Sequence, residues 1–187
     1  PDPDSLASQI PEQAFPVFQK AVNSGEFLTE NSLDSILSYC LMKENGKSLS
    51  SYMDVSEDLA RRIINQQNLL LSFSQSVSVL KTRELTQTRI QRALLHIILN
   101  IHTAPIQTPF ARVLGFRRES SELLSQIKQH SRIPLITKLA DAPNLLDSEG
   151  NQILSETVFS SNLYEKLLCL KTGRKFCHES QKQLIII

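Results

Sequence analysis

The stretch KTRELTQTRIQRALLHIILNI, residues 81–101, decides how the fold is organised, because it contains the strongest helical pattern of the chain. Apolar residues in its second part recur three and four positions apart, which is the spacing of one helical face. These residues are Ile90, Leu94, Ile97, Ile98 and Ile101. Since Leu95 and Leu99 extend the apolar surface, the pattern predicts a central core helix from Thr86 to about His102.

Basic residues gather before this helix and on its first turns. Lys81, Arg83, Arg89 and Arg92 are interleaved with three threonines and a single acidic residue. At about 100° per residue, the two helical arginines project away from the Ile90 face. Arginine forks and threonine hydroxyls suit phosphate oxygens, so one interpretation is a surface that contacts an RNA backbone. The alternative is a solvated helix face with local ion pairs.

Three shorter helices are predicted before residue 81. The apolar spacing of residues 33–41 predicts the first, with Thr29 or Asn31 as its N-cap and the sequence ENGK at 44–47 as its end. Ser56 is placed to cap the second, which carries Leu59 and Ile63. A third is predicted within residues 69–80. Prolines at positions 1, 3, 11 and 16 allow only short helices in residues 1–25.

The pattern changes after the prolines at positions 105 and 109. A short apolar run (112–116), an amphipathic helix (118–130) and a second short run (133–137) are typical of a βαβ unit with parallel strands. The helix carries a predicted buried stripe of Leu123, Leu124 and Ile127. A further helix is expected around Asn162–Leu170, and Gln183–Ile187 is expected to form a terminal strand.

The predicted fold class is therefore α+β and predominantly helical, with a helical bundle followed by a small parallel sheet. This sheet combines the βαβ unit, whose strands are Arg112–Phe116 and Ile133–Thr137, with the C-terminal strand. We expect residues 1–104 to form a helical region and residues 105–187 a small α/β region packed on it.

Composition favours a globular protein of the cytoplasm. Of the residues, 41% are hydrophobic, but no apolar run approaches the roughly 20 residues of a membrane span, and no signal-peptide pattern is present. Cys40, Cys169 and Cys177 are best interpreted as reduced thiols. Residues 1–80 hold 5 Lys or Arg against 10 Asp or Glu, whereas residues 81–187 hold 15 against 9. A basic second half is compatible with an anionic partner.

Motifs for catalysis or cofactor binding are missing from the sequence. The five glycines are dispersed, whereas phosphate-binding loops need clustered glycines, and no H-x-G-H arrangement is present. Cys169, Cys177 and His178 match no zinc spacing and lack a fourth ligand, so no metal is expected. Three aromatic residues could stack on bases, although their positions in apolar runs favour core packing: Phe110, Phe116 and Tyr164.

Two longer stretches resemble a bacterial family, the tRNA(Met) cytidine acetate ligases, which are related to HIGH-type nucleotidyltransferases. The family pattern K-T-[KR] followed by T-x-[ST]-R-[IL]-x-R is found here between Lys81 and Arg92. The pattern R-V-L-G-F is found at Arg112–Phe116 and is followed by I-T-K at Ile136–Lys138. Tyr52–Ile63 and Leu184–Ile187 are also similar. The resemblance extends from about residue 27 to residue 187.

The resemblance implies a parent enzyme that activates acetate with ATP and transfers the acetyl group to the wobble cytidine of elongator tRNA(Met). In this family an N-terminal α/β domain with a HIGH-like motif holds the nucleotide. The chain is therefore expected to be the non-catalytic C-terminal, tRNA-docking domain, with no cofactor of its own and ATP used by the full-length protein. The expected partners are tRNA and the N-terminal catalytic domain of the same polypeptide, with a homodimer left open.

The residues expected to contact RNA phosphates are Lys81, Arg83, Arg89, Arg92, Arg112 and Arg117. Two other functions are compatible with the sequence. One is a helical interaction or oligomerisation scaffold with no RNA contact, which would show an exposed apolar patch. The other is an autonomous enzyme, which would need a pocket with converging polar groups.

Overall fold

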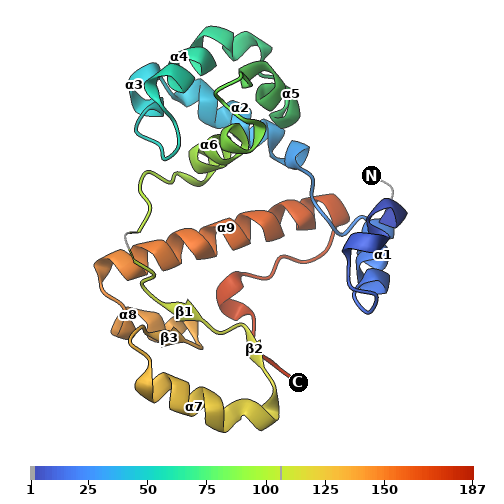
Figure 1. The fold of residues 1–187 in the computed structure, drawn as a ribbon, viewed down its shortest axis with the longest axis vertical. Helices are drawn as coiled ribbons and strands as arrows, with labels where there is room; N and C mark the ends of the chain where they lie inside the picture. Colours follow the sequence, from blue (N-terminus) through green and yellow to red (C-terminus); the bar gives the residue numbers. More distant parts are fainter. Residues whose placement is uncertain (1–2, 106) are drawn as a thin grey trace.

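The computed structural model describes residues 3–105 and 107–187 and is mainly helical, with two short pairs of parallel strands (Figure 1). The first part contains α1 (Phe15–Asn23), α2 (Asp34–Lys43), α3 (Gly46–Leu49), α4 (Glu57–Gln66), α5 (Phe73–Leu80) and α6 (Gln87–Leu99). The second part contains β1 (Ala111–Arg112), β2 (Gly115–Phe116), α7 (Ser121–His130), β3 (Leu135–Ile136), α8 (Ala142–Leu145), α9 (Ser148–Thr172) and β4 (Ile185–Ile186). The predicted α+β fold, mostly helical with a small parallel sheet, is confirmed.

Helices α2 to α6 form a bundle around one hydrophobic core, at the top of Figure 1. Helix α6 supplies its centre, because Ile90, Ala93 and Leu94 are completely buried. The helix ends where Asn100 adopts a left-handed conformation with φ of 57°. The central helix predicted from residues 81–101 is therefore confirmed, although it ends slightly earlier than expected. Leu95 and Leu99 are only half-buried, so the helix keeps one side toward solvent.

The helix caps agree with the prediction at one position and differ at another. The Ser56 hydroxyl accepts from the Leu59 amide at 3.3 Å, as expected for the N-cap of α4. The predicted cap of α2 is wrong, because no side chain caps this helix. The Asn31 side chain instead accepts from the Ser74 amide at 3.1 Å, in the first turn of α5. Residues that precede α2 thus hold the start of a different helix.

The strands form two parallel pairs, β1 with β3 and β2 with β4, in place of the single predicted sheet. Both pairs share the extended segment 111–117. The Ala111 amide donates to the Pro134 carbonyl, whereas the Leu114 carbonyl accepts from the Ile185 amide. Alternate residues of a strand direct their backbone groups to opposite sides, so β3 and β4 flank this segment on opposite sides.

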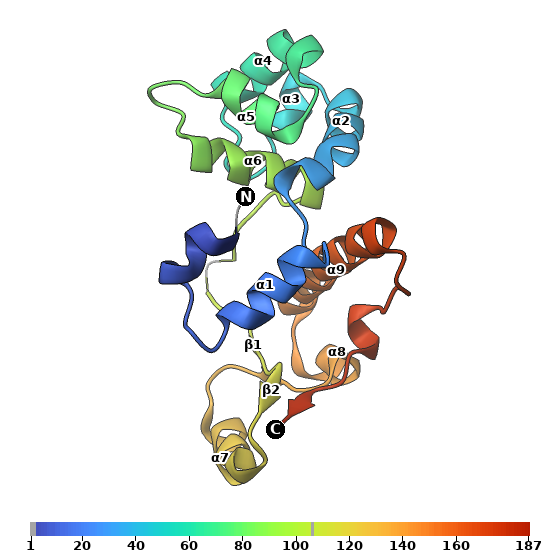
Figure 2. The ribbon, with the colours of Figure 1, turned by 90° about the vertical axis from the view of Figure 1, so that its right-hand side faces the viewer.

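Helix α9 connects the two parts of the molecule. It crosses the middle of Figure 1, lies to the right of the centre in Figure 2, and is much longer than the predicted helix around 162–170. Leu154 of α9 packs with Ile136 and Ala142 in a second, smaller core. Leu163, farther along the same helix, packs against the core of the bundle. The helix therefore serves two cores with different faces.

Helix α7 differs from its predicted burial. Leu123 and Ile127 are 57% and 45% exposed, and none of its residues is buried. The prediction of a buried apolar stripe on this helix is therefore wrong. The helix lies at the bottom of Figures 1 and 2, away from both hydrophobic cores.

Candidate functional site

The predicted basic run contributes to a groove between α4 and α6, which we call the arginine groove. It has a volume of about 590 Å³. Arg61 and Arg62 of α4 and Arg89 of α6 line it, together with Thr82 from the loop between α5 and α6, and two carboxylates, Asp58 and Glu84, line it as well. Sequence analysis missed the two α4 arginines as partners of Arg89, because the residues are 27 and 28 positions apart. Only the folded structure brings these three arginines, from α4 and from the first turn of α6, to the lining of one groove.

The arginines of this groove differ in their bonding. Arg61 faces Asp58 at 3.4 Å, and both side chains are exposed, so the pair is weak. Arg62 donates to the Val79 carbonyl at 2.9 Å. Arg89 makes no ion pair with any residue that the structure describes. A free guanidinium in a groove is available to an anion.

Lys81 and Arg83 lie in the loop between α5 and α6, where both side chains are exposed. Neither lines the arginine groove, and neither forms an ion pair within the described ranges. Their charges therefore extend the positive surface next to the groove without being part of its wall.

Arg92 and His96 converge on Asp54, a residue with a positive φ of 64°. The Arg92 Nε atom lies 3.2 Å from the Asp54 Oδ2 atom, and the His96 Nδ1 atom lies 3.4 Å from the same oxygen. The Met53 carbonyl is also 3.1 Å from His96 Nδ1. The charge of Arg92 is thus partly balanced by a carboxylate, unlike that of Arg89.

The last two predicted cations lie in the second part of the chain. Arg112 forms an ion pair with Glu179 at 2.8 Å, and their side chains are only 18% and 10% exposed. Arg117 lies 3.8 Å from Glu119, and both are largely exposed. The six predicted cations are therefore distributed over at least three places and do not share one surface.

Glu179 is the centre of a charge network that the sequence did not predict. Its carboxylate accepts from Arg112 and lies 3.0 Å from the amine of Lys182. Lys182 also approaches Glu165, which pairs with Arg174 at 2.9 Å. Burial alone would raise the pKa of the Glu179 carboxyl, but the bonds from the two cations outweigh it and hold this pKa below its usual range. The hydrogen bond to Glu179 raises the pKa of Lys182.

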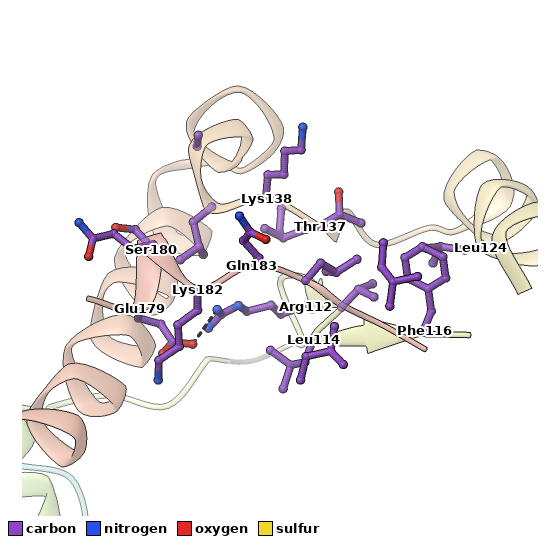
Figure 3. A pocket seen from close by; sticks show the side chains of 18 residues that line it. Arg112, Leu114, Phe116, Leu124, Thr137, Lys138, Glu179, Ser180, Lys182 and Gln183 are labelled. Carbon is purple, nitrogen blue, oxygen red and sulfur yellow. Dashed lines mark hydrogen bonds and ion pairs between the residues drawn. The ribbon is translucent and has the colours of Figure 1, made fainter. Parts of the chain in front are cut away.

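A larger groove lies beside this network, and we call it the strand groove (Figure 3). Its volume is about 930 Å³. Its walls come from the central segment 112–116, from residues 136–140 at the end of β3 and after it, and from residues 179–186 before and within β4. Figure 3 shows Glu179 and Lys182 toward one end and Phe116 and Leu124 toward the other. The groove therefore has a charged end and an apolar end.

Ser180 at the edge of this groove has a bonding pattern that superficially resembles a catalytic triad. His178 Nδ1 is 2.7 Å from the Ser180 hydroxyl, and His178 Nε2 is 2.7 Å from the Asn162 amide nitrogen. The Asn162 oxygen accepts from the Glu179 amide, which fixes the amide orientation. The backbone amide of Ser180 also donates to His178 Nδ1, at 3.2 Å, which makes His178 the cap of the short turn Glu179–Gln181. These bonds give the histidine a structural role in this turn.

Other candidate sites are structural. Within residues 3–105 and 107–187 no group of three His, Cys, Asp or Glu side chains is placed to hold a metal. Phe110 packs on the second core, as its position in the sequence indicates. Tyr164, in contrast, is 48% exposed.

None of the helices among the described residues is long and apolar enough to cross a membrane.

The family of the chain follows from comparison with known proteins. The family model of the HIGH Nucleotidyl Transferase matches residues 2–180, and the chain belongs to this family. The chain is 26% identical over 194 residues to the tRNA(Met) cytidine acetate ligase of Acetivibrio thermocellus, with 98% of this chain and 46% of that protein covered. It is 28% identical to the same ligase of Clostridium tetani, with 88% and 41% covered. The chain thus spans about half the length of the curated relatives it matches.

Two solved structures of Thermotoga maritima TmcAL have the same fold. The apo form matches with a TM-score of 0.83 and 16% identity, over 95% of this chain and 46% of that one. The form bound with alpha-thio ATP matches with a TM-score of 0.81 and 18% identity, over 95% and 47%. At this identity the likeness concerns the fold.

These matches correct three expectations. The expectation of a non-catalytic C-terminal docking domain is wrong, because the nucleotidyl transferase model itself covers residues 2–180. A separate N-terminal catalytic domain as partner is for the same reason not supported. The expectation that this chain takes no cofactor is not supported either, since the family is one of nucleotidyl transferases and a neighbour in fold binds an ATP analogue.

Proposed function

We propose that this chain works in an ATP-dependent ligase that acetylates tRNA, and that its arginine groove holds the phosphate backbone of that tRNA. The family match and the names of the relatives support the ligase class. In such a reaction acetate attacks the α-phosphorus of ATP and releases pyrophosphate. The amine of the cytidine then takes the acetyl group from the acetyl-adenylate and releases AMP. None of the residues is assigned to ATP, because the sequence has no glycine-rich phosphate loop.

The observation that carries the RNA part is the position of Arg89. It shares a groove with Arg61, Arg62 and Thr82, and it has no carboxylate partner among the described residues. Guanidinium groups from two helices can hold phosphate oxygens from two sides, and threonine adds a short donor. Such contacts position a nucleic acid without reading its bases.

The other predicted cations should differ in how much they contribute to RNA binding. Lys81 and Arg83 are exposed beside the groove and would add phosphate contacts. Arg92, Arg112 and Arg117 would contribute less, because each already faces a carboxylate. A phosphate at these positions would have to compete with that carboxylate.

The test is the binding of tRNA(Met) at several salt concentrations, with the double variant Arg61→Ala and Arg89→Ala. Each lost phosphate contact lowers the slope of log affinity against log salt by about 0.7–0.9, so the pair should lower it by about 1.5. Arg132→Ala is the matched control, because Arg132 is an exposed arginine outside the groove. An unchanged slope in the folded double variant would contradict the RNA contact.

The ligase part has its own test. The protein is incubated with labelled acetate and tRNA, with and without ATP, and label in the tRNA is measured. We expect incorporation only with ATP. If no label enters tRNA under conditions where tRNA is bound, the ligase assignment is wrong while the RNA contact stands.

We also propose that residues 1–104 and 105–187 are two regions of one compact unit acting in the cytoplasm, where such a ligase meets tRNA. The two separate hydrophobic cores support this division. Limited proteolysis should cleave first near residues 103–105 or 107–108, which are exposed and lie between the regions, if the proposal holds.

A further inference from the structure

The strand groove is a second candidate binding site, separate from the arginine groove. No residue lines both. Its volume of about 930 Å³ lies within the range of about 300–1,000 Å³ that is usual for small-molecule sites. Of the six residues predicted to contact RNA, Arg112 alone lines the strand groove, and Arg112 forms an ion pair with Glu179.

The topology explains why a groove opens here. After the central segment 111–117 the chain passes through α7 to β3 on one side, and then through α8 and α9 to β4 on the other side. A change of side of this kind leaves a crevice between neighbouring strands, where α/β proteins commonly bind ligands. The groove extends from residues 136–140, at the end of β3 and after it, to residues 179–186, which lead into and include β4.

The charged end of the groove has an excess of positive charge. The network contains Arg112, Lys182 and Arg174 against two carboxylates, Glu165 and Glu179. Lys138 adds a further cation to the wall of the groove. It is exposed and makes no ion pair with the described residues. Lys138, which lies between the two ends in Figure 3, is therefore the cation of the groove wall that is available to an anion, because Arg112 and Lys182 already face carboxylates.

The rest of the groove suits a flat, largely apolar body with polar edges. Phe116 and Leu124 lie toward the other end in Figure 3. Gln183 and Thr137 lie between the ends, and their side chains can both donate and accept hydrogen bonds. An aromatic face with neighbouring amide and hydroxyl groups is typical of sites for an unstacked nucleobase.

We propose that the strand groove binds a nucleoside phosphate, with the phosphate at Lys138 and the base against Phe116 and Leu124. The ligand is a free nucleotide or one nucleotide of a single-stranded RNA, since both present the same phosphate and base. A simple fatty acid would satisfy Lys138 and Phe116 but would leave Gln183 and Thr137 without partners. The proposal does not depend on the arginine groove or on the ligase assignment.

The experiment measures binding of AMP, CMP and a fluorescent pentacytidylate, with adenosine and cytidine as probes that lack the phosphate. The variants are Lys138→Glu and Gln183→Ala, both exposed positions of the groove wall. The matched control is Lys128→Glu, an exposed lysine of α7 outside the groove. Loss of a bond to a charged group weakens binding about tenfold or more, so we expect this for Lys138→Glu and no change for Lys128→Glu.

The outcomes separate the sources of the ligand. Binding of pentacytidylate alone identifies RNA, whereas equal binding of a mononucleotide that competes with it identifies a free nucleotide. If none of the three phosphate-containing probes binds, or if both Lys138→Glu and Gln183→Ala bind as tightly as the unaltered protein, the proposal is overturned. A 4-thiouridine oligonucleotide should crosslink to the tryptic peptides 133–138 or 183–187.

The arginine-groove variant keeps this test distinct from the earlier one. Arg61→Ala with Arg89→Ala should bind mononucleotides as the unaltered protein does, because neither residue lines the strand groove. If mononucleotides bound this double variant more weakly but bound Lys138→Glu normally, they would bind in the arginine groove and not in the strand groove. That result would overturn the inference.

Discussion

Gly115 lies so close to Ile185 that a Cβ atom at position 115 would stand 2.7 Å from the Ile185 carbonyl oxygen. Side-chain atoms do not approach backbone that closely, so Gly115→Ala should push β4 away from β2. We expect a loss of about 1–3 kcal/mol in the free energy of unfolding, the range for overpacked sites. Faster hydrogen exchange at the Ile185 and Ile187 amides, which bond to Leu114 and Phe116, would report the displacement directly.

Gly46→Ala is the control for this substitution, because nothing lies within 4 Å of a Cβ at that position. It should leave stability unchanged or slightly improved, since alanine favours helix. Equal exchange rates at Ile185 in Gly115→Ala and the unaltered protein would show that β4 tolerates the methyl group.

Leu94→Ala should destabilise the bundle more than any change on the exposed side of α6. Leu94 is completely buried in the bundle core, whereas the adjacent Leu95 is only half-buried. Leucine-to-alanine changes in a core lower the free energy of unfolding by about 2–5 kcal/mol, because a cavity remains. Urea denaturation of Leu94→Ala and Leu95→Ala compares the two positions, and similar losses would contradict the central position of the Leu94 face.

Asn31→Ala should destabilise α5, although Asn31 lies more than 40 residues earlier in the chain. Its side-chain oxygen accepts from the Ser74 amide at 3.1 Å and from the Ser74 hydroxyl at 2.8 Å. The N-cap of α5 is Ser72, whose hydroxyl accepts from the Gln75 amide, so Asn31→Ala removes only the added bonds to Ser74 and should lower the free energy of unfolding by about 1 kcal/mol. Thr29→Ala is the matched control, because the Thr29 side chain makes no capping bond. If Thr29→Ala lowered the free energy of unfolding more than Asn31→Ala, Asn31 would not be the residue that stabilises the start of α5.

The sequence predicted the parts of the fold that depend on local patterns. The helix around Leu94 was predictable because one apolar face meets one core. Helix α9 was predicted only in part, since Leu154 faces the second core and Leu163 faces the bundle, so its apolar residues do not form one stripe. For the strands, the sequence predicts that they pair in parallel. It does not predict on which side of the central segment β3 and β4 lie, because short apolar runs carry no information about that.

The candidate sites depended more on tertiary structure than the fold did. Local charge pattern identified Arg89, but its neighbours in the groove come from α4. The partner of Arg112 is Glu179, 67 residues later in the chain, and nothing in the local sequence indicates this pairing. Arg89 and Arg112 carry the same charge but have different roles, because Arg89 lines a groove and Arg112 forms a largely buried ion pair.

The Arg112–Glu179 ion pair should make stability depend on acid pH. The two cations around Glu179 hold the pKa of its carboxyl below the unfolded value, so the folded form favours the carboxylate. Its stabilising contribution is then complete above the unfolded pKa of about 4.3 and is lost as pH falls through the lower folded pKa. Glu179→Gln should remove this dependence and leave the partly buried Arg112 without a counter-charge, which lowers the free energy of unfolding by about 1–3 kcal/mol near neutral pH.

Denaturation midpoints of Glu179→Gln and the unaltered protein between pH 3 and pH 7 measure this difference. The gap between the two should be largest at pH 7 and should shrink toward pH 3, where the carboxyl of the unaltered protein becomes protonated. Glu119→Gln is the control, since Glu119 pairs with Arg117 in solvent and exposed pairs contribute little. A constant gap across the pH range would mean that packing, and not the charge of Glu179, stabilises this part of the fold.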